Sequence, residues 1–446
     1  MKFKGLLIAV IVLAGLAGGV YWSDKAKQAE EKAPAKDAPP KILTIPDDQF
    51  KGIRLQKTGG DATVVQKSDA GKWEIKEPKP LAADQDSVGS VVSALSSLTS
   101  DRLIEDKASD LAPYGLASPS IEVIVTKKDG KTEDLLIGDD TPTGGSTFVK
   151  LKNDPRVFSV SSGTKSSLDK SSKDLRDKRL LTFDSDKLTR VELQAKGQTV
   201  EFGKNNQNEW QILKPKPLRA DGSQVEELVR KLKDAKMDTS VSDEDAKKAV
   251  TAFGSGTKVG VANVSDSAGT QTIEVRVVSK DKDKNYYAKS TAVEGIYKVA
   301  NDLGEGLDKD LNSFRNKKLF DFGFNDPTKV TIDKTTYEKS AEKWMVGGKQ
   351  MESASVQAVV DKLRDLASTK FLDSGTGATV LEAGITSNDG KRHEKVTIMK
   401  QGAGYIAKRE NEPSVYELDG KVVEELQKTA SEVKEFQPPK PDTKKK

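Results

Sequence analysis

The segment WEIKEPKPLAAD occupies residues 73–84, and the similar segment WQILKPKPLRAD occupies residues 210–221. The two segments match at 8 of 12 positions without a gap, and their first residues are 137 positions apart. A repeat of this kind indicates that one folded unit has been duplicated within the chain. Duplicated units are more typical of display or binding than of a single buried catalytic site.

An amphipathic helix is predicted after each repeated segment, and a third copy of this helix follows Trp344. Every copy carries five apolar residues at the i, i+3, i+4, i+7 and i+10 spacing of one helix face. The three stripes are Val88, Val91, Val92, Leu95 and Leu98; Val225, Leu228, Val229, Leu232 and Ala235; and Val356, Val359, Val360, Leu363 and Leu366. We expect all three stripes to be buried. The third copy has lost three residues before its helix, where the first two copies carry their prolines.

An acidic residue precedes each stripe by four positions, namely Asp84, Asp221 and Glu352. A carboxylate at this place accepts hydrogen bonds from free backbone N–H groups at a helix start, so we expect helix N-caps here. Gln224 adds the spacing of a capping box after Asp221.

Alternating apolar and polar residues predict antiparallel hairpins around these helices. One hairpin begins with IEVIV at 121–125, and another turns at Asp69–Lys72. A strand that leads into a helix closes each unit, at 157–168, 296–307 and 415–426. The predicted fold class is therefore α+β, with an N-terminal single transmembrane helix followed by three tandem repeat units of antiparallel hairpins with packed helices.

The chain of 446 residues has room for about three domains of roughly 150 residues each. The predicted segments are a membrane anchor at 1–23, a disordered tether at 24–41, repeat units at 42–184, 185–323 and 324–436, and a disordered basic tail at 437–446.

The N-terminus combines Lys2 and Lys4 with an uncharged run of 18 residues from Gly5 to Trp22. A helix of this length spans about 27 Å, close to the thickness of the hydrocarbon core of a membrane. Because the run ends in Tyr21 and Trp22 and lacks a clear cleavage site, an uncleaved anchor is favoured over a cleaved signal peptide. We expect a single-pass protein of the cytoplasmic (inner) membrane, with the bulk of the chain periplasmic or extracellular.

The composition excludes several classes of function. There are 73 Lys and Arg residues against 69 Asp and Glu residues, so no strong field attracts a nucleic acid. With no cysteine, the chain has no disulfide, thiolate nucleophile or Cys-ligated metal. The single histidine, His393, lies in the charged stretch DGKRHEK, which favours a solvated residue over a catalytic base or metal ligand.

A serine–lysine site would need neither histidine nor cysteine, but its motifs are incomplete. Ser162 and Lys165, like Ser167 and Lys170, have S-x-x-K spacing, and a K-T-G starts at Lys57. However, the K-T-G precedes the serines and no S-D-N occurs, so we expect no such site.

A calcium loop is also incomplete. Asp281, Asp283 and Asn285 begin the D-x-D-x-N pattern, but Tyr286 stands where glycine is needed and Ala292 where glutamate is needed. The sequence cannot select an acid/base pair among the many carboxylates. We therefore predict no catalytic residue, no cofactor site and no metal site.

The tryptophans and prolines of the repeats are interpreted as structural. Trp73, Trp210 and Trp344 are predicted core residues rather than exposed platforms for a sugar or peptide, because alternation places Ile75 and Ile212 on the same strand face as their tryptophans. The repeated prolines are interpreted as an extended connection from strand to helix.

Several phrases together resemble a bacterial domain-of-unknown-function family of membrane-anchored proteins, which are encoded beside gliding-motility-type ABC transporter components. The phrases are W-x-I-x-x-P-x-x-x-x-A-D, the aliphatic helix, YGLASP at 114–119, LIG at 136–138 and LRDKRLLTF at 175–183. The resemblance is partial in the second unit, where FGSG at 253–256 replaces the YGL phrase, and faint in the third, where AGI at 383–385 remains. It implies an extracytoplasmic accessory role and supplies no catalytic residues.

The expected function is a membrane-anchored extracytoplasmic non-enzymatic accessory or scaffold protein of an ABC-type membrane complex. Its expected partners are the cytoplasmic membrane and ABC-type transporter subunits, with no nucleic acid. The alternative is a binding module for a cell-envelope polymer, and a carboxylate-based hydrolase is third.

Overall fold

Strands dominate this protein. The computed structural model describes residues 40–241, 243–280, 283–325 and 327–438. Strands account for 43% of the chain and helices for 23%, so the predicted α+β class is wrong and the protein is mostly β. The mostly β class was not predicted because several hairpin strands are long, up to the 12 residues of β17 (Gly269–Lys280). Strands therefore include more residues than the predicted helices.

No helix in the described part of the chain is long and apolar enough to cross a membrane. The run from Gly5 to Trp22, which the predicted fold class assigned to a transmembrane helix, lies outside the described residues. That part of the fold prediction therefore has no support.

The described chain divides between Lys178 and Arg179 into two compact units. The first unit contains one large sheet and the second contains two. We call each large sheet, with the helices that follow its strands, the first, second and third repeat. The segment boundaries predicted from the sequence stay predictions.

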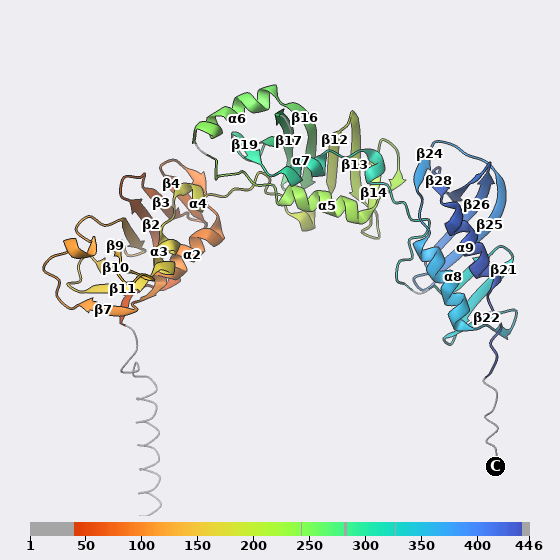
Figure 1. Ribbon diagram of the computed structural model, residues 1–446, viewed down its shortest axis with the longest axis horizontal. Helices are drawn as coiled ribbons and strands as arrows, with labels where there is room; N and C mark the ends of the chain where they lie inside the picture. Colours follow the sequence, from red (N-terminus) through yellow and green to blue (C-terminus); the bar gives the residue numbers. More distant parts are fainter. Residues whose placement is uncertain (1–39, 242, 281–282, 326, 439–446) are drawn as a thin grey trace, which may run out of the picture. The chain divides into compact units, whose positions relative to one another are not determined.

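All three large sheets are antiparallel and consist of two meanders joined at their first strands (Figure 1). The strand orders are β5-β4-β3-β2-β8-β9-β10-β11-β7, β15-β14-β13-β12-β16-β17-β18-β19 and β23-β22-β21-β20-β25-β26-β27-β28-β24. A helix follows the first meander, with a further helix, α6 (Asp243–Ser255), in the second repeat, and a shorter helix follows the second meander.

The first repeat comprises β2 (Phe50–Lys57), β3 (Thr63–Lys67), β4 (Trp73–Glu77), β5 (Leu81–Ala82), β7 (Arg102–Glu105), β8 (Ile121–Lys127), β9 (Thr132–Asp140), β10 (Ser146–Leu151) and β11 (Val157–Ser161). A separate two-stranded sheet pairs β1 (Lys41–Thr44) with β6 (Ser97–Thr99). The helices of the first repeat are α2 (Gln85–Ser96), α3 (Ser162–Leu168) and α4 (Ser172–Leu175), with 3-10 turns at Asp47–Gln49 and Ala112–Tyr114.

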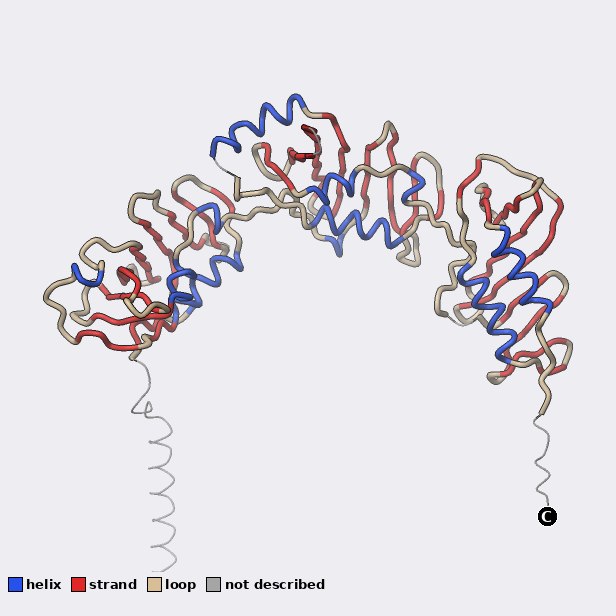
Figure 2. The backbone as a smooth tube through the Cα atoms, viewed as in Figure 1, coloured by secondary structure: helices blue, strands red, loops and turns tan. Residues whose placement is uncertain are grey.

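The second repeat comprises β12 (Arg190–Ala195), β13 (Gln198–Lys204), β14 (Trp210–Lys214), β15 (Leu218–Arg219), β16 (Thr257–Asp266), β17, β18 (Asp283–Ser290) and β19 (Ile296–Val299). Its helices are α5 (Gly222–Lys233), α6 (Asp243–Ser255) and α7 (Asn301–Leu307), with 3-10 turns at Ser185–Lys187 and Leu311–Ser313. In Figure 2, α5 and α7 lie on the opposite side of this sheet from α6.

The third repeat comprises β20 (Lys329–Ile332), β21 (Thr335–Ser340), β22 (Lys343–Val346), β23 (Lys349–Gln350), β24 (Lys370–Leu372), β25 (Ala378–Ser387), β26 (Arg392–Gln401), β27 (Gly404–Arg409) and β28 (Val415–Leu418). Its helices are α8 (Ser353–Asp365) and α9 (Gly420–Ser431).

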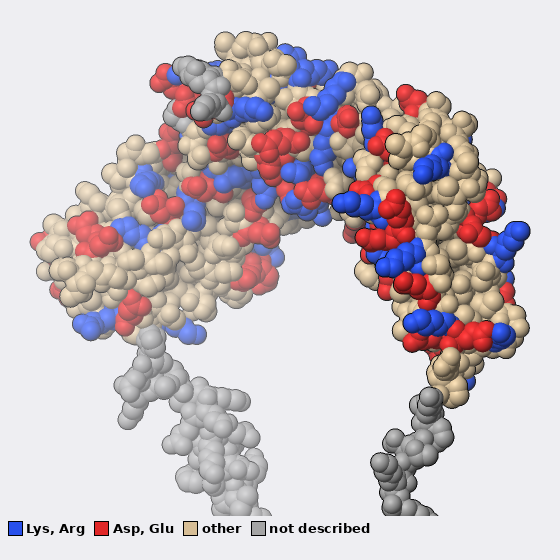
Figure 3. Space-filling view, turned by 45° about the vertical axis from the view of Figure 1, so that its right-hand side comes forward, with Lys and Arg blue, Asp and Glu red and all other residues tan. Residues whose placement is uncertain are grey.

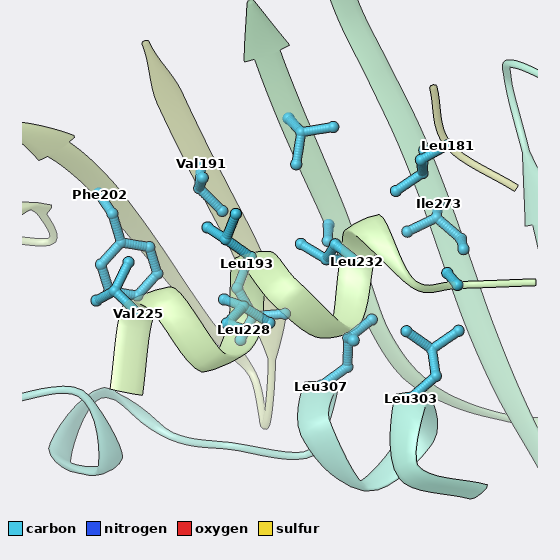
Figure 4. Close-up of a cluster of buried hydrophobic side chains, with 14 of the residues drawn as sticks. Leu181, Val191, Leu193, Phe202, Val225, Leu228, Leu232, Ile273, Leu303 and Leu307 are labelled. Atoms are coloured by element: carbon cyan, nitrogen blue, oxygen red, sulfur yellow. The ribbon is translucent and has the colours of Figure 1, made fainter. Parts of the chain in front are cut away.

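The predicted apolar stripes are confirmed as core residues. The first four positions of each stripe lie in α2, α5 or α8 and are buried, and the fifth is buried just past the helix end. In the second repeat, Val225, Leu228 and Leu232 of α5 share one core with strand residues such as Val191 and Phe202 (Figure 4). Each repeat therefore has its own hydrophobic core between a helix and one face of its sheet.

The predicted helix caps are confirmed for two repeats. Ser87 N donates to Asp84 Oδ1 at 2.8 Å, and Gln224 N donates to Asp221 Oδ1 at 3.3 Å. Glu352 occupies the N-cap of α8, but its longer side chain makes no cap hydrogen bond. The capping box is wrong, because Gln224 Oε1 accepts from Lys309 Nζ at 2.9 Å instead of turning back to its own helix.

The proline segments form tight turns rather than the predicted extended connections. β5 folds back to pair with β4, and β15 folds back to pair with β14, so the prolines lie in the turn between paired strands. In the third repeat, Gly347 and Gly348 make this turn with φ values of 56° and 84°. A two-residue turn with positive φ at both positions favours glycine. The third repeat is three residues shorter here because this turn has two residues instead of three, and because β22 ends two residues after Trp344 whereas β4 ends four residues after Trp73.

Two connecting segments make the same pattern of backbone hydrogen bonds to the elements on either side of them. We call them the first strap (residues 175–183) and the second strap (residues 314–322). The second strap joins the second repeat to the third through four backbone hydrogen bonds. These are Asp221 N to Phe314 O (2.8 Å), Asn316 N to Arg219 O (3.0 Å), Leu319 N to Leu366 O (2.9 Å) and Ser368 N to Lys317 O (2.8 Å).

Candidate functional site

His393 does not lie in a catalytic setting. It is an exposed residue of β26, and its Nδ1 lies 3.1 Å from Thr386 Oγ1 on the neighbouring strand. This agrees with the solvated histidine expected from the sequence.

The serine–lysine motif is used for local structure. Lys165 Nζ donates to Asp140 Oδ1 at 2.9 Å, and Ser162 O accepts a hydrogen bond from Ser166 Oγ at 2.9 Å within α3. In the K-T-G, Lys57 pairs with Asp169 at 2.9 Å. The structure thus assigns these lysines to carboxylate partners.

The residues of the incomplete calcium loop lie in and before a strand. Asp281 is outside the described residues, whereas Asp283 and Asn285 belong to β18 and pair with Lys280 and Val278 of β17. Within the described part of the chain, no group of three or more acidic or histidine residues could hold a metal ion.

The three repeated tryptophans are core residues, as predicted. Trp73 and Trp210 are each 7% exposed and Trp344 is 3% exposed. Their rings are therefore not available as flat platforms for a sugar or a peptide.

The YGL and LIG phrases of the first repeat pack against each other. A Cβ atom on Gly138 would lie 2.1 Å from Tyr114 O, so only glycine lets this loop rest on β9. Tyr114 Oη donates to Glu105 at 2.7 Å, and this hydrogen bond raises the pKa of Tyr114. These phrases fix a loop rather than supply chemistry.

One carboxylate pair that sequence spacing could not select lies on the open face of the second sheet. Glu192 and Glu201 stand directly opposite each other on β12 and β13, with side chains 15% and 10% exposed. Arg190 Nη2 bonds both of them, at 3.2 Å and 2.6 Å. Asn263 Nδ2 also donates to Glu192 at 3.0 Å, beside a cavity of about 240 Å³.

Acid catalysis by a carboxylate pair requires a carboxyl group with a raised pKa, whereas the pKa of Glu201 is lowered. Lys214 donates to Glu201 at 2.8 Å, and this bond, with the charge of Arg190, holds the pKa of Glu201 below its ordinary value. Glu192 and Glu201 therefore both have cationic or amide partners, as is common for polar side chains on a sheet face that is not covered by a core.

A cluster of charged and polar side chains joins the second repeat to the third, and we call it the junction cluster. Its centre is Arg219 of β15, whose side chain is only 15% exposed. The guanidinium bonds Asp321 at 2.6 Å, Glu412 at 3.0 Å and Tyr416 Oη at 3.0 Å. It also donates to Lys318 O in the second strap at 2.6 Å.

A second arginine extends the junction cluster from the third repeat. Arg409 bonds Glu412 at 3.1 Å and Glu394 at 3.0 Å, and it donates to Leu319 O of the second strap. Asp321 N donates to Glu394 Oε1 at 2.8 Å. Arginine is suited to this role because its planar fork can bond several acceptors at once.

Aromatic rings complete the contact. Arg315 of the second strap lies 3.6 Å from the ring centre of Phe371 and donates to Ser414 Oγ at 2.9 Å. Phe371 in turn packs edge-on against Tyr416. Arginine and tyrosine are enriched among the residues that contribute most of the binding energy of protein interfaces.

Burial and charge act on the titrating groups in opposite directions. Burial alone would lower the pKa of Arg219, but Asp321, Tyr416 and Glu412 outweigh it and raise the pKa. Burial raises the pKa of Tyr416. Arg219 therefore stays charged, which its acidic neighbours require.

Sequence reasoning did not single out Arg219, although a signal was present. Within the two matching segments, Ala82 and Arg219 occupy the same position, and this mismatch replaces a methyl group with a cation.

A protein-family model described as a domain of unknown function, DUF4340, matches residues 73–217 and 210–384. The chain belongs to the DUF4340 family. Each matched segment of this DUF4340 protein begins at a repeated tryptophan and runs across a strap into the next sheet. No curated protein and no solved structure matches the chain.

Proposed function

We propose that this DUF4340 protein is a non-enzymatic accessory or scaffold protein of an ABC-type membrane complex and that its repeats work outside the cytoplasm. The junction cluster carries the scaffold part of this proposal. A set of largely buried, mutually bonded polar side chains holds two copies of one fold together, and this would maintain a fixed surface for partners.

The surface charge supports a protein partner over a polyanion. Acidic and basic side chains are interspersed on the face seen in Figure 3. The formal net charge of the whole chain is only +4. Such a surface has no strong single-sign field, so recognition would depend on shape and local pairs.

The transporter and the location rest on sequence. The resemblance to proteins encoded beside ABC transporter components supports the partner, and the basic head before an apolar run supports export to the outer face of the cytoplasmic membrane. The protein should then sediment with membranes and stay there after a high-salt wash.

Co-purification from native membranes tests the proposal. A C-terminally tagged chain is cross-linked in cells and isolated, and its partners are identified by mass spectrometry. ABC-type permease or ATPase subunits are the expected partners. Their absence, together with retention of the protein on envelope glycan or turnover of a glycan or ester library, would contradict the scaffold function.

The alternative function, a binding module for a cell-envelope polymer, draws on the cluster around Glu192. Arg190, Lys214, Glu192 and Glu201 sum to no net charge. Arg190 and Glu192, with Asn263, border the cavity of about 240 Å³. A neutral glycan offers matching hydroxyl groups. Loss of glycan retention in Glu192→Ala, with retention kept in Glu74→Ala on the first repeat, is the result that would favour this alternative.

A further inference from the structure

The two straps have closely similar backbone contacts. Asp84 N bonds Leu175 O at 2.8 Å in the first repeat, as Asp221 N bonds Phe314 O at 2.8 Å in the second. At the other end, Leu180 N bonds Ala235 O at 2.8 Å, as Leu319 N bonds Leu366 O at 2.9 Å. The chain nevertheless divides at the first strap, after Lys178, and not at the second. The backbone therefore does not explain the difference.

The side chains at equivalent positions do differ. Ala82 stands where the second repeat has Arg219, and Thr182 stands 139 residues before Asp321 in the matching strap phrase. The equivalent positions, Ala82 and Thr182, thus carry neither the guanidinium nor the carboxylate of the 2.6 Å ion pair between Arg219 and Asp321.

The side chains of the following repeat that bond each strap differ in the same way: they are neutral in the second repeat and charged in the third. Thr182 N of the first strap donates to the neutral Gln271 Oε1 at 2.8 Å, whereas Asp321 N of the second strap donates to the carboxylate of Glu394 at 2.8 Å. Ser290 donates to Leu180 O, whereas Arg409 donates to Leu319 O. The charged set also includes Asp321 of the second strap and Glu412 of the third repeat, which bond Arg219 of the preceding repeat.

We infer that Arg219 is a lock that makes the second and third repeats one rigid unit. Its fork is nearly buried between Asp321 and Glu412, so separating the repeats would take both carboxylates away from Arg219, although Arg409 of the third repeat would still bond Glu412. The inference rests on the proposed function in one respect only: the rigid unit would fix the distance between partner-binding sites on the two repeats.

Limited proteolysis of the full chain tests the lock. Lys317 and Lys318 are exposed residues of the second strap, and trypsin can cut beside them only when the backbone bonds of the strap open. Arg219→Ala should raise the rate of this cleavage by roughly 25-fold or more, equivalent to about 2 kcal/mol at 1.4 kcal/mol per factor of ten. Arg219→Lys keeps the charge but loses the fork and should fall between this variant and the parent.

The matched control is Arg230→Ala, which removes an arginine from the exposed face of α5 where it pairs with Glu227 at 2.7 Å. Its cleavage rate at the second strap should equal that of the parent. A second readout uses the absence of cysteine, since Ser267→Cys with Ala403→Cys places one spin label on each repeat. Arg219→Ala should broaden the distance distribution between the labels.

Circular dichroism first establishes that each variant is folded. A folded Arg219→Ala chain that is cut at the parental rate and keeps a narrow distance distribution would overturn the inference. Should Arg219→Ala fail to fold, Glu412→Gln and Arg219→Lys decide the question by the same two readouts. Co-purification of transporter subunits is a separate measurement, so the scaffold function can fail while the lock stands, and the reverse also holds.

Discussion

At the scale of single residues, Gly138 shows how a family phrase can serve packing. The carbonyl of Tyr114 occupies the space that a side chain on β9 would need. We predict that Gly138→Ala destabilises the first repeat by about 1 to 3 kcal/mol, as overpacking of a tight site does. Urea unfolding followed by tryptophan fluorescence measures this loss.

The control for this variant is Gly89→Ala. Gly89 lies within α2, and a Cβ atom there meets nothing within 4 Å. Alanine is the better helix former, so this change should stabilise the chain by about 0.5 to 1 kcal/mol. Equal effects of the two substitutions would show that the loop does not rest on Gly138.

Glu201 gives a prediction with a pH window. The hydrogen bond from Lys214 and the charge of Arg190 lower its pKa in the fold, relative to an unfolded value of about 4.3. A lowered carboxyl pKa stabilises the fold above the unfolded value, and this stabilisation is lost as the pH falls through the folded pKa.

Glu201→Gln should therefore be less stable than the parent at pH 7, and the difference should shrink as the pH falls below about 4. Urea midpoints of the two proteins at several pH values make the comparison. A difference that stays constant with pH would mean that the carboxylate charge contributes nothing.

At the scale of elements, the three helix starts provide an internal comparison. Asp84 and Asp221 cap their helices through side-chain hydrogen bonds, but Glu352 at the same place makes none. We predict that Glu352→Asp stabilises the third repeat by about 0.5 to 1 kcal/mol, because the shorter carboxylate can reach the backbone N–H groups. The reverse change, Asp84→Glu, should destabilise the first repeat, and thermal melts of both variants report the sign.

The helices and their caps could be predicted because their signals are local. The spacing of Val88, Val91 and Leu95 carries the helix period, and a carboxylate four positions earlier marks its start. Burial of Trp73 likewise follows from alternation with Ile75.

The remaining features depend on contacts that no local pattern contains. β5 turns back after the prolines to pair with β4, and this pairing is a contact between strands. The fraction of the chain in strands depends on how far each hairpin extends. The partners of Arg219 lie 102 and 193 positions away at Asp321 and Glu412. Only the mismatch with Ala82 marked this arginine in advance.

At the scale of the whole molecule, the scaffold proposal predicts tolerance at the residues that a catalytic reading would choose. His393→Ala, Ser162→Ala, Asp84→Asn and Asp221→Asn, made singly, should leave cellular function largely intact. The cap variants should lose only about 1 kcal/mol or less of stability. Complementation of a deletion strain, beside a thermal melt of each variant, tests this expectation.

One outcome would reverse the proposal. Complete loss of function at any of these positions, with an unchanged melt, would place a catalytic or ligand site there and remove the case for a scaffold.

The straps also constrain how duplication can add repeats to such a gene. In the second repeat, the segment that follows α5 pairs with residues of the first strap, as Leu180 N does with Ala235 O, so the repeat is closed by chain that precedes its own sheet. A duplication cut cleanly between sheets would leave that segment without its pairing strand. A duplicated segment would therefore have to include the strap in order to fold. The segments matched by the family model begin at a tryptophan and run through a strap, so they contain the parts that such a duplication requires.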